Sequence, residues 1–422
     1  MKRVGRLVPM LGATLLLGAL VAGCGAAGGD GGDPVATIYV SAPLSGPASS
    51  DGTDIRDGAL LALIDAGGKV SGDSVEGIEV GGVKVDVKFS DDASNSSRFD
   101  QVKTAANARA ASEDSTSIAY IGELDSGATR VSLPITNNAD ILQVSPGSGA
   151  SDLVRAESFN DDVPTEFQTN GKRSFARLVP SDEKVGEAMG ELLRKAPGAG
   201  SILISDGSEF AQILTDSARS EVPELPRGPE GKKAENCRRA VQMASVLGVE
   251  PSAAPGRPIA KPRILLAAEP LCSARILKAF GRRNLAASVI TSDAVLGQPT
   301  SDFGDAAQVE VVSAATDPGQ LAHSHDEFVG AFIARFGRSP GRYAAYGYEA
   351  MASVLAALDR SDDATDRDSV TSAYFDGTKR DSVLTPYSID EIGDTSLDVS
   401  TVYVKRPGKS ALQLDSLIGL GN

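Results

Sequence analysis

Three stretches rich in glycine and serine hold residues that could bind an anion. They span Ser41–Pro47, Gly122–Gly127 and Ser145–Gly149. Turns of this composition can point several backbone N–H groups at one negative charge, with serine hydroxyls beside them. Any one of the three could be an ordinary turn. Because each directly follows a short apolar run, the three together favour a shared polar binding site.

Residue types that support catalysis or metal binding are scarce. The two histidines, His323 and His325, stand together just before a predicted helix that begins at Glu327. Such an H-x-H pair could bind a metal, but helix capping and solvation explain it better here, away from the three stretches. The chain also lacks a P-loop. We therefore expect a protein that is not an enzyme and that uses no metal and no cofactor.

Short apolar runs alternate with helical patterns from Pro34 onwards, and they place the three stretches at one edge of a sheet. Such alternation predicts a mostly parallel sheet covered by helices. In these sheets ligands bind beyond the carboxyl ends of the strands, where loops lead into helices. The predicted strands are Ile38–Val40, Val83–Phe89, Ile118–Ile121 and Ile141–Val144, and the predicted helices are Ile55–Ala66, Gln101–Ala111 and Ala128–Asn137.

A second series of the same kind follows the predicted strand Phe175–Val179. The stretch Val222–Lys261 interrupts it with many Pro, Gly and basic residues around one plausible helix, Cys237–Leu247. Roughly 390 residues after the leader exceed what one hydrophobic core usually supports, so we expect two α/β lobes. The other predicted elements are the strands Ile202–Ile204, Ile264–Ala267, Ser288–Thr291 and Val309–Ser313 and the helices Lys184–Arg194, Ala211–Arg219, Ser273–Gly281, Glu327–Phe336 and Tyr343–Leu358.

The first residues indicate export. A basic start leads into the apolar run Leu7–Val21 and then into small residues, as in a secretory signal. The run is shorter than the ~20 residues that a membrane-spanning helix needs. Val21-Ala22-Gly23-Cys24 resembles a bacterial lipobox, in which the cysteine receives a diacylglycerol and the chain is cut before it; an ordinary signal with a chance cysteine is the alternative.

We therefore expect residues 1–23 to be a lipoprotein signal peptide and residues 24–34 to be a flexible tether. Acyl chains on Cys24 would anchor the mature protein to the outer face of the cytoplasmic membrane or in the periplasm and cell envelope. Cys237 and Cys272 then remain as a possible disulfide in an oxidising compartment, with two separate thiols as the alternative. The net charge of −15 argues against nucleic acid as a partner.

Seven stretches resemble the type I periplasmic binding proteins, above all the branch that binds leucine, isoleucine, valine and related amino acids or amides for ABC importers. The order of the stretches carries the resemblance. It implies an α/β fold of two doubly wound parallel-sheet lobes joined by a three-strand hinge. The stretches are Ile38–Pro47, Asp57–Ala59, Phe89–Asp92, Tyr120–Gly122, Val144–Gly147, Tyr346–Met351 and Ile389–Asp394.

The resemblance also implies that the chain crosses between the lobes near Val179, Ala314 and Leu384. Lobe one would hold residues 35–178 plus 315–383, and lobe two residues 179–314 plus 384–422. Closure about the three crossings would trap a small ligand in the cleft between the lobes.

By the same resemblance, Ser126 and the main-chain amides of Gly147 and Ser148 would bind the α-carboxylate of an amino acid. Gly149 stands where the family often has threonine, so one hydroxyl contact is missing. Asp293, from lobe two, would bind the α-ammonium group, with a helix or turn cap as the alternative. A buried carboxylate without a cation would itself argue for a positively charged ligand.

Two further positions bear on the ligand. Glu269 stands about where the family has an aromatic residue, and Phe210 stands near another aromatic position of the pocket wall. A second carboxylate could favour a basic amino acid or a polyamine, although Glu269 could also be a solvated loop residue.

From these patterns we expect a lipid-anchored receptor that captures an amino acid or a related amide or amine and passes it to an ABC transporter permease. The alternative is a ligand sensor or accessory receptor that signals through a separate membrane protein.

Overall fold

The computed structural model describes residues 34–71, 74–155, 166–167, 169–196, 200–229, 232–246, 261–296, 299–321 and 327–419. Residues Pro34–Asn422 form one compact unit. The predicted signal peptide, Cys24, the tether up to residue 33 and both histidines lie outside the described residues. Within the described ranges, no helix has both the length and the apolar character that crossing a membrane requires.

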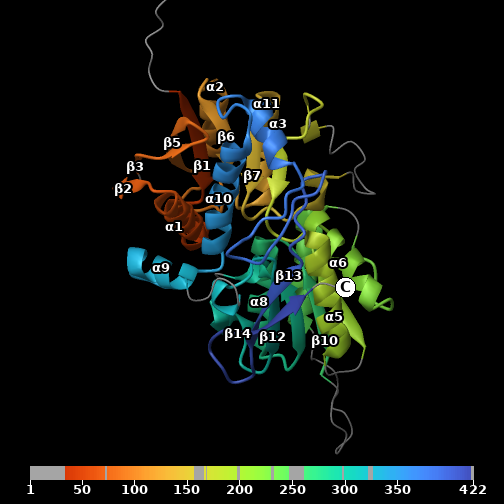
Figure 1. The fold of residues 1–422 in the computed structure, drawn as a ribbon. Coiled ribbons are helices and arrows are strands. Elements are labelled where there is room, and N and C mark those ends of the chain that lie inside the picture. The colour runs from red at the N-terminus through yellow and green to blue at the C-terminus, as the bar shows by residue number, and fades with distance from the viewer. Residues whose placement is uncertain are drawn as a thin grey trace, which may run out of the picture. The chain divides into compact units, whose positions relative to one another are not determined.

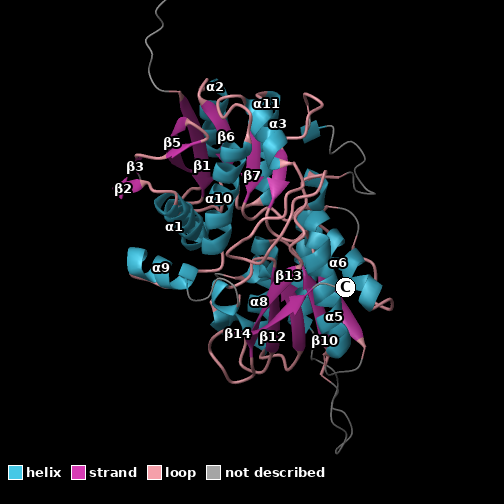
Figure 2. Cartoon of the chain, in the orientation of Figure 1, coloured by secondary structure: helices cyan, strands magenta, loops and turns pink. Residues whose placement is uncertain are grey.

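Lobe one is built on a six-stranded sheet in the order β4-β5-β1-β6-β7-β8. Its strands are parallel except for the short edge strand β4, which is antiparallel to β5. Strands alternate along the chain with helices that cover the sheet (Figures 1 and 2). The strands are β1 Val35–Ala42, β4 Glu79–Val80, β5 Val83–Asp91, β6 Ser117–Ile121, β7 Leu142–Ser145 and β8 Phe175–Arg177, with a separate hairpin of β2 Lys69–Ser71 and β3 Ser74–Glu76.

The two faces of this sheet are covered by different helices. Helices α1 and α10 pack together over the main core, and α2 and α3 pack over the smaller cluster that includes Tyr39 and Tyr120. The lobe-one helices are α1 Ser49–Asp65, α2 Gln101–Glu113, α3 Ser126–Asn138, α9 Glu327–Phe336, α10 Ala344–Arg360 and α11 Arg367–Tyr374, with the 3₁₀ turns η1 Gly46–Ala48 and η2 Ser151–Leu153.

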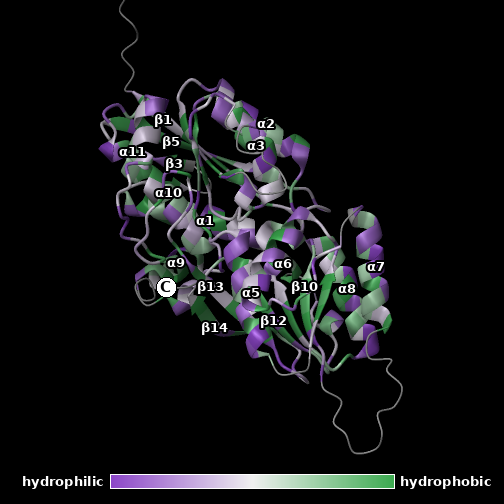
Figure 3. Ribbon diagram, turned by 90° about the vertical axis from the view of Figure 1, so that its right-hand side faces the viewer, coloured by the Kyte–Doolittle hydropathy of each residue, from purple (hydrophilic) through white to green (hydrophobic). Residues whose placement is uncertain are grey.

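Lobe two is built on a second six-stranded sheet, in the order β14-β13-β12-β11-β10-β9. Strands β9 to β12 are parallel, whereas β13 and β14 form an antiparallel hairpin at the edge. Figure 3 shows β10 and β12 mostly in green, as expected for strands covered on both faces. The strands are β9 Ser201–Ser205, β10 Arg263–Ala267, β11 Ser288–Ser292, β12 Gln308–Ser313, β13 Val399–Lys405 and β14 Gln413–Gly419.

Helices α5 and α6 cover one face of the second sheet, and α7 and α8 cover the other. A disulfide between Cys237 and Cys272 joins α7 to α8, with the two Cα atoms 5.8 Å apart. The lobe-two helices are α5 Asp182–Lys195, α6 Glu209–Glu221, α7 Lys233–Val246 and α8 Pro270–Arg283, with the 3₁₀ turns η3 Asp293–Val295, η4 Thr300–Phe303 and η5 Pro318–Gln320 after β11 and β12.

The chain passes between the two sheets three times: after β8, after β12 and before β13. Arg177, fully buried at the end of β8, ties two of these passages together. Its Nη1 donates to the carbonyl oxygens of Gly149 and Ala150 at 2.8 and 2.7 Å, and its Nε donates to Asp394 in the third passage. The loop that follows β7 is therefore fixed to the crossings.

The expected fold class is confirmed, with one correction. The sheets are mixed rather than purely parallel, because β4, β13 and β14 run antiparallel to their neighbours. The helix predicted at Cys237–Leu247 begins earlier, at Lys233. The lobe boundaries drawn from the sequence stay a prediction; Leu384, Tyr387 and other residues of the last passage pack in the core of lobe one.

Candidate functional site

Loops at the carboxyl ends of both sets of parallel strands meet between the lobes. The backbone N–H of Asp182, at the start of α5, donates to the carbonyl of Gly149 at 2.8 Å. Arg130 of α3 lies 3.9 Å from Glu209 at the start of α6. These contacts bring the predicted site residues of lobes one and two to the same region.

In the loop after β7, the polar groups bind one another. The hydroxyl of Ser145 accepts from the N–H groups of Gly147 and Ser148 at 3.2 and 2.9 Å. The hydroxyl of Ser148 is fully buried and contacts Thr129 Oγ1 and the carbonyl of Glu123 at 2.7 and 3.1 Å. A carboxylate could bind these two amides only if it replaced the Ser145 hydroxyl.

Ser126 is better placed for an anion. It is the first residue of α3 and is partly exposed, and its hydroxyl accepts from the N–H of Ala150 at 3.2 Å. The hydroxyl hydrogen can still be donated, and the helix N-terminus favours negative charge. Arg130 lies four residues further along and hence on the same face of the helix. Its guanidinium binds the buried Asp152 at 2.7 Å.

Asp293 already has a cation. Its Oδ2 accepts from Arg342 Nη1 at 3.0 Å and from the hydroxyl of Ser313 at 3.0 Å. Arg342 also binds Asp51 at 2.9 Å through Nη2. Although burial opposes it, the charges of Asp51 and Asp293 raise the pKa of Arg342 further above its usual range. Asp293 therefore gives no separate argument for a positively charged ligand, because the chain supplies that charge itself. That Asp293 binds a ligand amine stays a prediction.

Gly149 makes room for Asp182. A Cβ atom on Gly149 would lie only 2.5 Å from Asp182 Oδ1. Burial raises the pKa of Asp182 to about 7, and the charge of Asp293 adds to the effect while Arg177 and Arg130 oppose it. The absence of threonine at position 149 thus has a steric reason. Glycine leaves room for the carboxyl group of Asp182 in the region between the lobes.

Glu269 and Phe210 lie at the carboxyl edge of lobe two. Glu269 directly precedes α8, and its N–H donates to Asp206 Oδ2 at 3.0 Å. Phe210, in the first turn of α6, packs partly buried against the lobe-two core. Burial and the charge of Asp152 raise the pKa of the neighbouring Glu209, and Glu269 contributes in the same direction. Both predicted residues therefore stand in an acidic environment.

A buried pair of carboxyl groups lies behind the loops of lobe one. Asp92 follows β5 and Glu123 follows β6; they are 1% and 0% exposed. Tyr120 donates its hydroxyl to Glu123 Oε1 at 2.6 Å. Burial and the facing carboxyl raise the pKa of Glu123 well above its usual range, and burial raises that of Asp92 to about 6. Both carboxyl groups therefore keep their protons to a higher pH than exposed carboxyl groups do.

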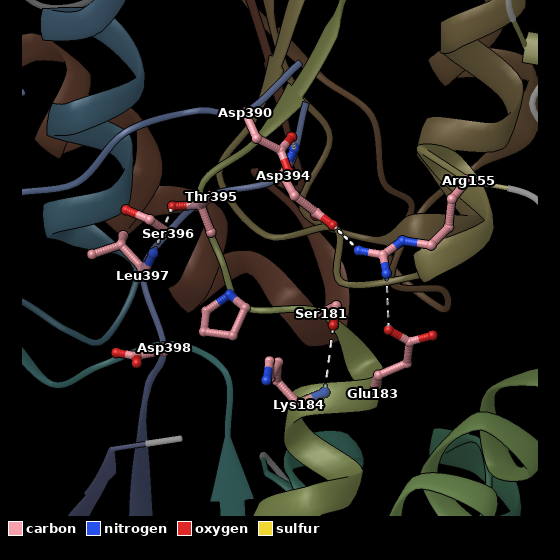
Figure 4. A pocket seen from close by; sticks show the side chains of 11 residues that line it. Arg155, Ser181, Glu183, Lys184, Asp390, Asp394, Thr395, Ser396, Leu397 and Asp398 are labelled. Carbon is pink, nitrogen blue, oxygen red and sulfur yellow. Dashed lines mark hydrogen bonds and ion pairs between the residues drawn. The ribbon is translucent and has the colours of Figure 1, made fainter. Parts of the chain in front are cut away.

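A cavity of about 310 Å³ lies at the crossings rather than among the predicted ligand residues. Figure 4 shows Arg155 beside it, pointing to Asp394 and to Glu183, with Glu183 Oε2 at 3.5 Å. None of the six predicted ligand residues lines this cavity. It is bounded by segments of the first and third passages, which identifies it as part of the hinge region.

The described residues add no catalytic arrangement. Gly337-Arg338-Ser339-Pro340-Gly341 matches the letters of a G-x-S-x-G nucleophile elbow, but it joins helix α9 to α10 instead of following a strand. Among the residues that the structure describes, no three His, Cys, Asp or Glu side chains are grouped to hold a metal ion.

Sequence reasoning missed Arg130, Arg342 and Asp182. A usable signal existed for Arg130, because it lies four residues after Ser126 on a predicted helix. No comparable signal existed for Arg342, whose partner Asp293 is 49 residues away.

The chain has two mostly parallel sheets, each covered by helices, and passes between them three times. This is the fold of the type I periplasmic binding proteins. Solved structures agree. The chain matches the leucine-binding protein LivK of Thermotoga maritima with a TM-score of 0.65 and 18% identity, over 91% of this chain and 99% of that one. No family model and no curated protein matches the chain.

Two other structures of the same fold were solved with ligands. An ABC transporter substrate-binding protein from Desulfitobacterium hafniense, in complex with Leu, gives a TM-score of 0.65 at 19% identity, over 90% of this chain and 99% of that one. A solute-binding protein of an ABC transporter from Rhodopseudomonas palustris was solved in complex with 3,4-dihydroxybenzoic acid. It gives a TM-score of 0.63 at 18% identity, over 92% of this chain and 99% of that one. Identities this low establish the fold of the chain and leave its ligand open.

Proposed function

We propose that this chain is the solute-binding receptor of an ABC importer, anchored outside the cytoplasmic membrane by a lipid on Cys24. It captures a small ligand between its lobes, an amino acid or a related amide or amine, and delivers it to a permease. The observation that carries the proposal is the meeting of polar side chains from both lobes, with Arg130 beside Glu209 and Arg342 beside Asp293.

In this proposal the ligand carboxylate binds at Ser126, where the N-terminus of α3 and the nearby Arg130 favour an anion. Gly147 and Ser148 contribute their amides if the Ser145 hydroxyl turns away. The acidic edge of lobe two, with Asp293 and Glu269, faces the ligand amine, and Phe210 lies beside it. Small cations and zwitterions suit this edge, because Glu209, Glu269 and Asp293 all bring carboxyl groups to it.

A thermal-shift screen of the chain from Gly25 onwards tests the proposal. The screen covers amino acids, amides, polyamines and aromatic carboxylates, the last because a structure of the same fold holds 3,4-dihydroxybenzoic acid. A true ligand at a hundred times its dissociation constant stabilises the fold by about 2.7 kcal/mol. Ser126→Ala should lose part of the shift, whereas Gly330→Ala, on an exposed position of α9, should keep it.

If no compound of these classes raises the melting temperature, the proposal that the chain is a receptor for such compounds is wrong. Anchoring is tested separately: Cys24→Ala should release the protein from membranes or block its processing, and a correctly cut, membrane-bound variant would contradict it. Co-purification of the mature chain with a permease supports transport, while co-purification with a kinase supports the sensor alternative.

A further inference from the structure

Two arginines just before α10 face a row of three aspartates on α1. Asp51, Asp54 and Asp57 are spaced by three residues and therefore lie along one side of the helix. Arg338 binds two of them, with Nη1 at 2.6 Å from Asp54 and Nη2 at 2.7 Å from Asp57. Arg342 binds the third, Asp51, at 2.9 Å. All of these contacts stay within lobe one.

Arg342 differs from Arg338 in its second contact, which reaches lobe two. Its Nη1 lies 3.0 Å from Asp293 Oδ2 and 3.2 Å from the hydroxyl of Ser313. The guanidinium also lies over the ring of Tyr343, 4.9 Å from its centre. One cation thus holds a carboxylate of each lobe at the same time.

The surroundings of Arg342 make this bridge stronger than a surface ion pair. The side chain of Arg342 is 10% exposed, and those of Asp51 and Asp293 are 20% and 25% exposed. Water screens such a pair less than a pair on the surface. Without the guanidinium, two carboxylates would face each other across the lobe boundary and repel.

We propose that Arg342 is a built-in cation of the cleft, which occupies the position that the sequence assigns to a ligand ammonium at Asp293 and thereby latches lobe two to lobe one. The bridge stabilises the closed arrangement through the chain's own charges. A ligand amine then competes with Arg342 for Asp293, and Arg342 retains Asp51 when it is displaced. The inference rests on the proposed receptor function, because closure matters only if a ligand is captured between the lobes. Its test needs no ligand.

The test measures the distance between the lobes without any ligand. Nitroxide labels are placed at Val102→Cys on α2 and Lys278→Cys on α8, both at exposed positions in different lobes. The chain from Gly25 onwards is used, since it contains the compact unit Pro34–Asn422. Pulsed electron spin resonance then reports the distribution of distances for the parent and for three variants.

Arg342→Gln removes the bridge. Arg338→Gln is its matched control, because each arginine binds two aspartates but both partners of Arg338 lie on α1. We expect the open-to-closed ratio to rise about tenfold in Arg342→Gln, equivalent to about 1.4 kcal/mol. Arg338→Gln should keep the parent distribution. Asp293→Asn breaks the same bridge from lobe two and should reproduce the Arg342→Gln result, even if Arg342→Gln itself folds poorly.

The proposal is overturned if Arg342→Gln and Asp293→Asn both keep the parent distribution, or if Arg338→Gln opens the lobes equally. A failure of the receptor function would appear separately, as the absence of any stabilising solute in the thermal-shift screen, and would leave the distance measurement unaffected.

Discussion

Single residues at the cleft owe their roles to partners that are distant in the sequence. The resemblance assigns Asp293 to a ligand amine, but Arg342 supplies the cation. It assigns the main-chain N–H of Ser148 to a ligand carboxylate, but that N–H donates to the Ser145 hydroxyl inside lobe one. A residue type at a motif position therefore predicts that a group is near the cleft, whereas its hydrogen-bond partners decide whether it can bind a ligand.

Ser126 and Ser148 should respond differently to the loss of the hydroxyl. Ser126→Ala removes a donor to a charged ligand group, so affinity for the best solute of the screen should fall by about 1.5–3 kcal/mol in calorimetry. Ser148→Ala removes two internal hydrogen bonds, so the free energy of unfolding should fall by about 1–3 kcal/mol with a smaller effect on affinity. The reverse pattern would place Ser148, and not Ser126, against the ligand.

The buried pair Asp92 and Glu123 should make stability decrease as the pH rises. The folded protein raises both pKa values, so the pair's stabilising contribution is complete below about pH 4. The part due to Asp92 is lost as the pH rises through about 6, and the part due to Glu123 is lost at higher pH. Asp92→Asn removes one of the two charges. The difference in free energy of unfolding between Asp92→Asn and the parent should shift in favour of the variant by about 1 kcal/mol or more as the pH rises from 4 to 8.

Asp91 offers a neighbouring control with the opposite sign. Burial would raise its pKa, but Lys103, the N–H of Ala93 and Ser45 outweigh burial and lower it. Its contribution is present above the ordinary aspartate pKa and is lost as the pH falls. Asp91→Asn should therefore destabilise the protein at pH 8. If denaturant titrations show the same pH trend for both variants, the pKa of Asp92 is not raised in the folded protein.

At the scale of elements, α1 and α10 approach closely through two glycines. A Cβ on Gly58 would lie 1.9 Å from the carbonyl oxygen of Ala344, and a Cβ on Gly347 would lie 2.2 Å from that of Ile55. These glycines belong to two of the stretches that resemble the periplasmic binding proteins. Close contact of the two helices also sets where Asp51 and Arg342 meet, because one lies at the start of each helix.

Gly347→Ala should therefore force α1 and α10 apart. Overpacking of this kind costs about 1–3 kcal/mol of unfolding free energy. Gly330→Ala is the matched control in α9, because a Cβ atom added at Gly330 would have no neighbouring atom within 4 Å outside its own helix backbone. That exposed helical change should stabilise by up to about 1 kcal/mol. Equal effects in chemical denaturation would mean that α1 and α10 are not in close contact at Gly347.

Most elements of both sheets follow from apolar runs and helical spacing, but β14 at the edge of the second sheet does not. Strand β14 contains Gln413, Asp415 and Ser416 and is largely exposed, so no apolar run marks it. The positions of Ser126 and Asp293 were predictable, because each directly follows a strand end or its loop at the carboxyl edge of its sheet. That they bind a ligand stays a prediction. Arg342 and Asp182 were not predictable, since their roles depend on how the lobes meet and on the space left by Gly149.

At the scale of the whole molecule, three passages of chain link lobes that also share ion pairs. Arg155 joins Asp394 of the third passage to Glu183 of α5, and Arg177 fixes the loop after β7 to the same passage. These contacts lie near the hinge, where small rotations move atoms least. Arg130 and Arg342 also bind across the lobe boundary, and Arg342 lies beside Ser313, the last residue of β12, where the second passage begins.

Ligand binding should make the molecule more compact, and Arg342 should set by how much. A ligand held by both lobes stabilises the closed arrangement in proportion to its differential affinity for that arrangement. The parent, already latched by Arg342, should show a small fall in radius of gyration on saturation with the best solute of the screen. Arg342→Gln should start with a larger radius, fall further and reach the same final value.

Small-angle scattering of the parent, Arg342→Gln and Arg338→Gln measures this directly, with saturation checked by calorimetry. Arg338→Gln should behave as the parent, because its two aspartates lie on α1 alone. Equal falls in all three would show that the latch adds nothing to closure. An unchanged radius in all three at proven saturation would remove the hinge mechanism altogether, and the ligand would then bind to lobes that keep a fixed distance.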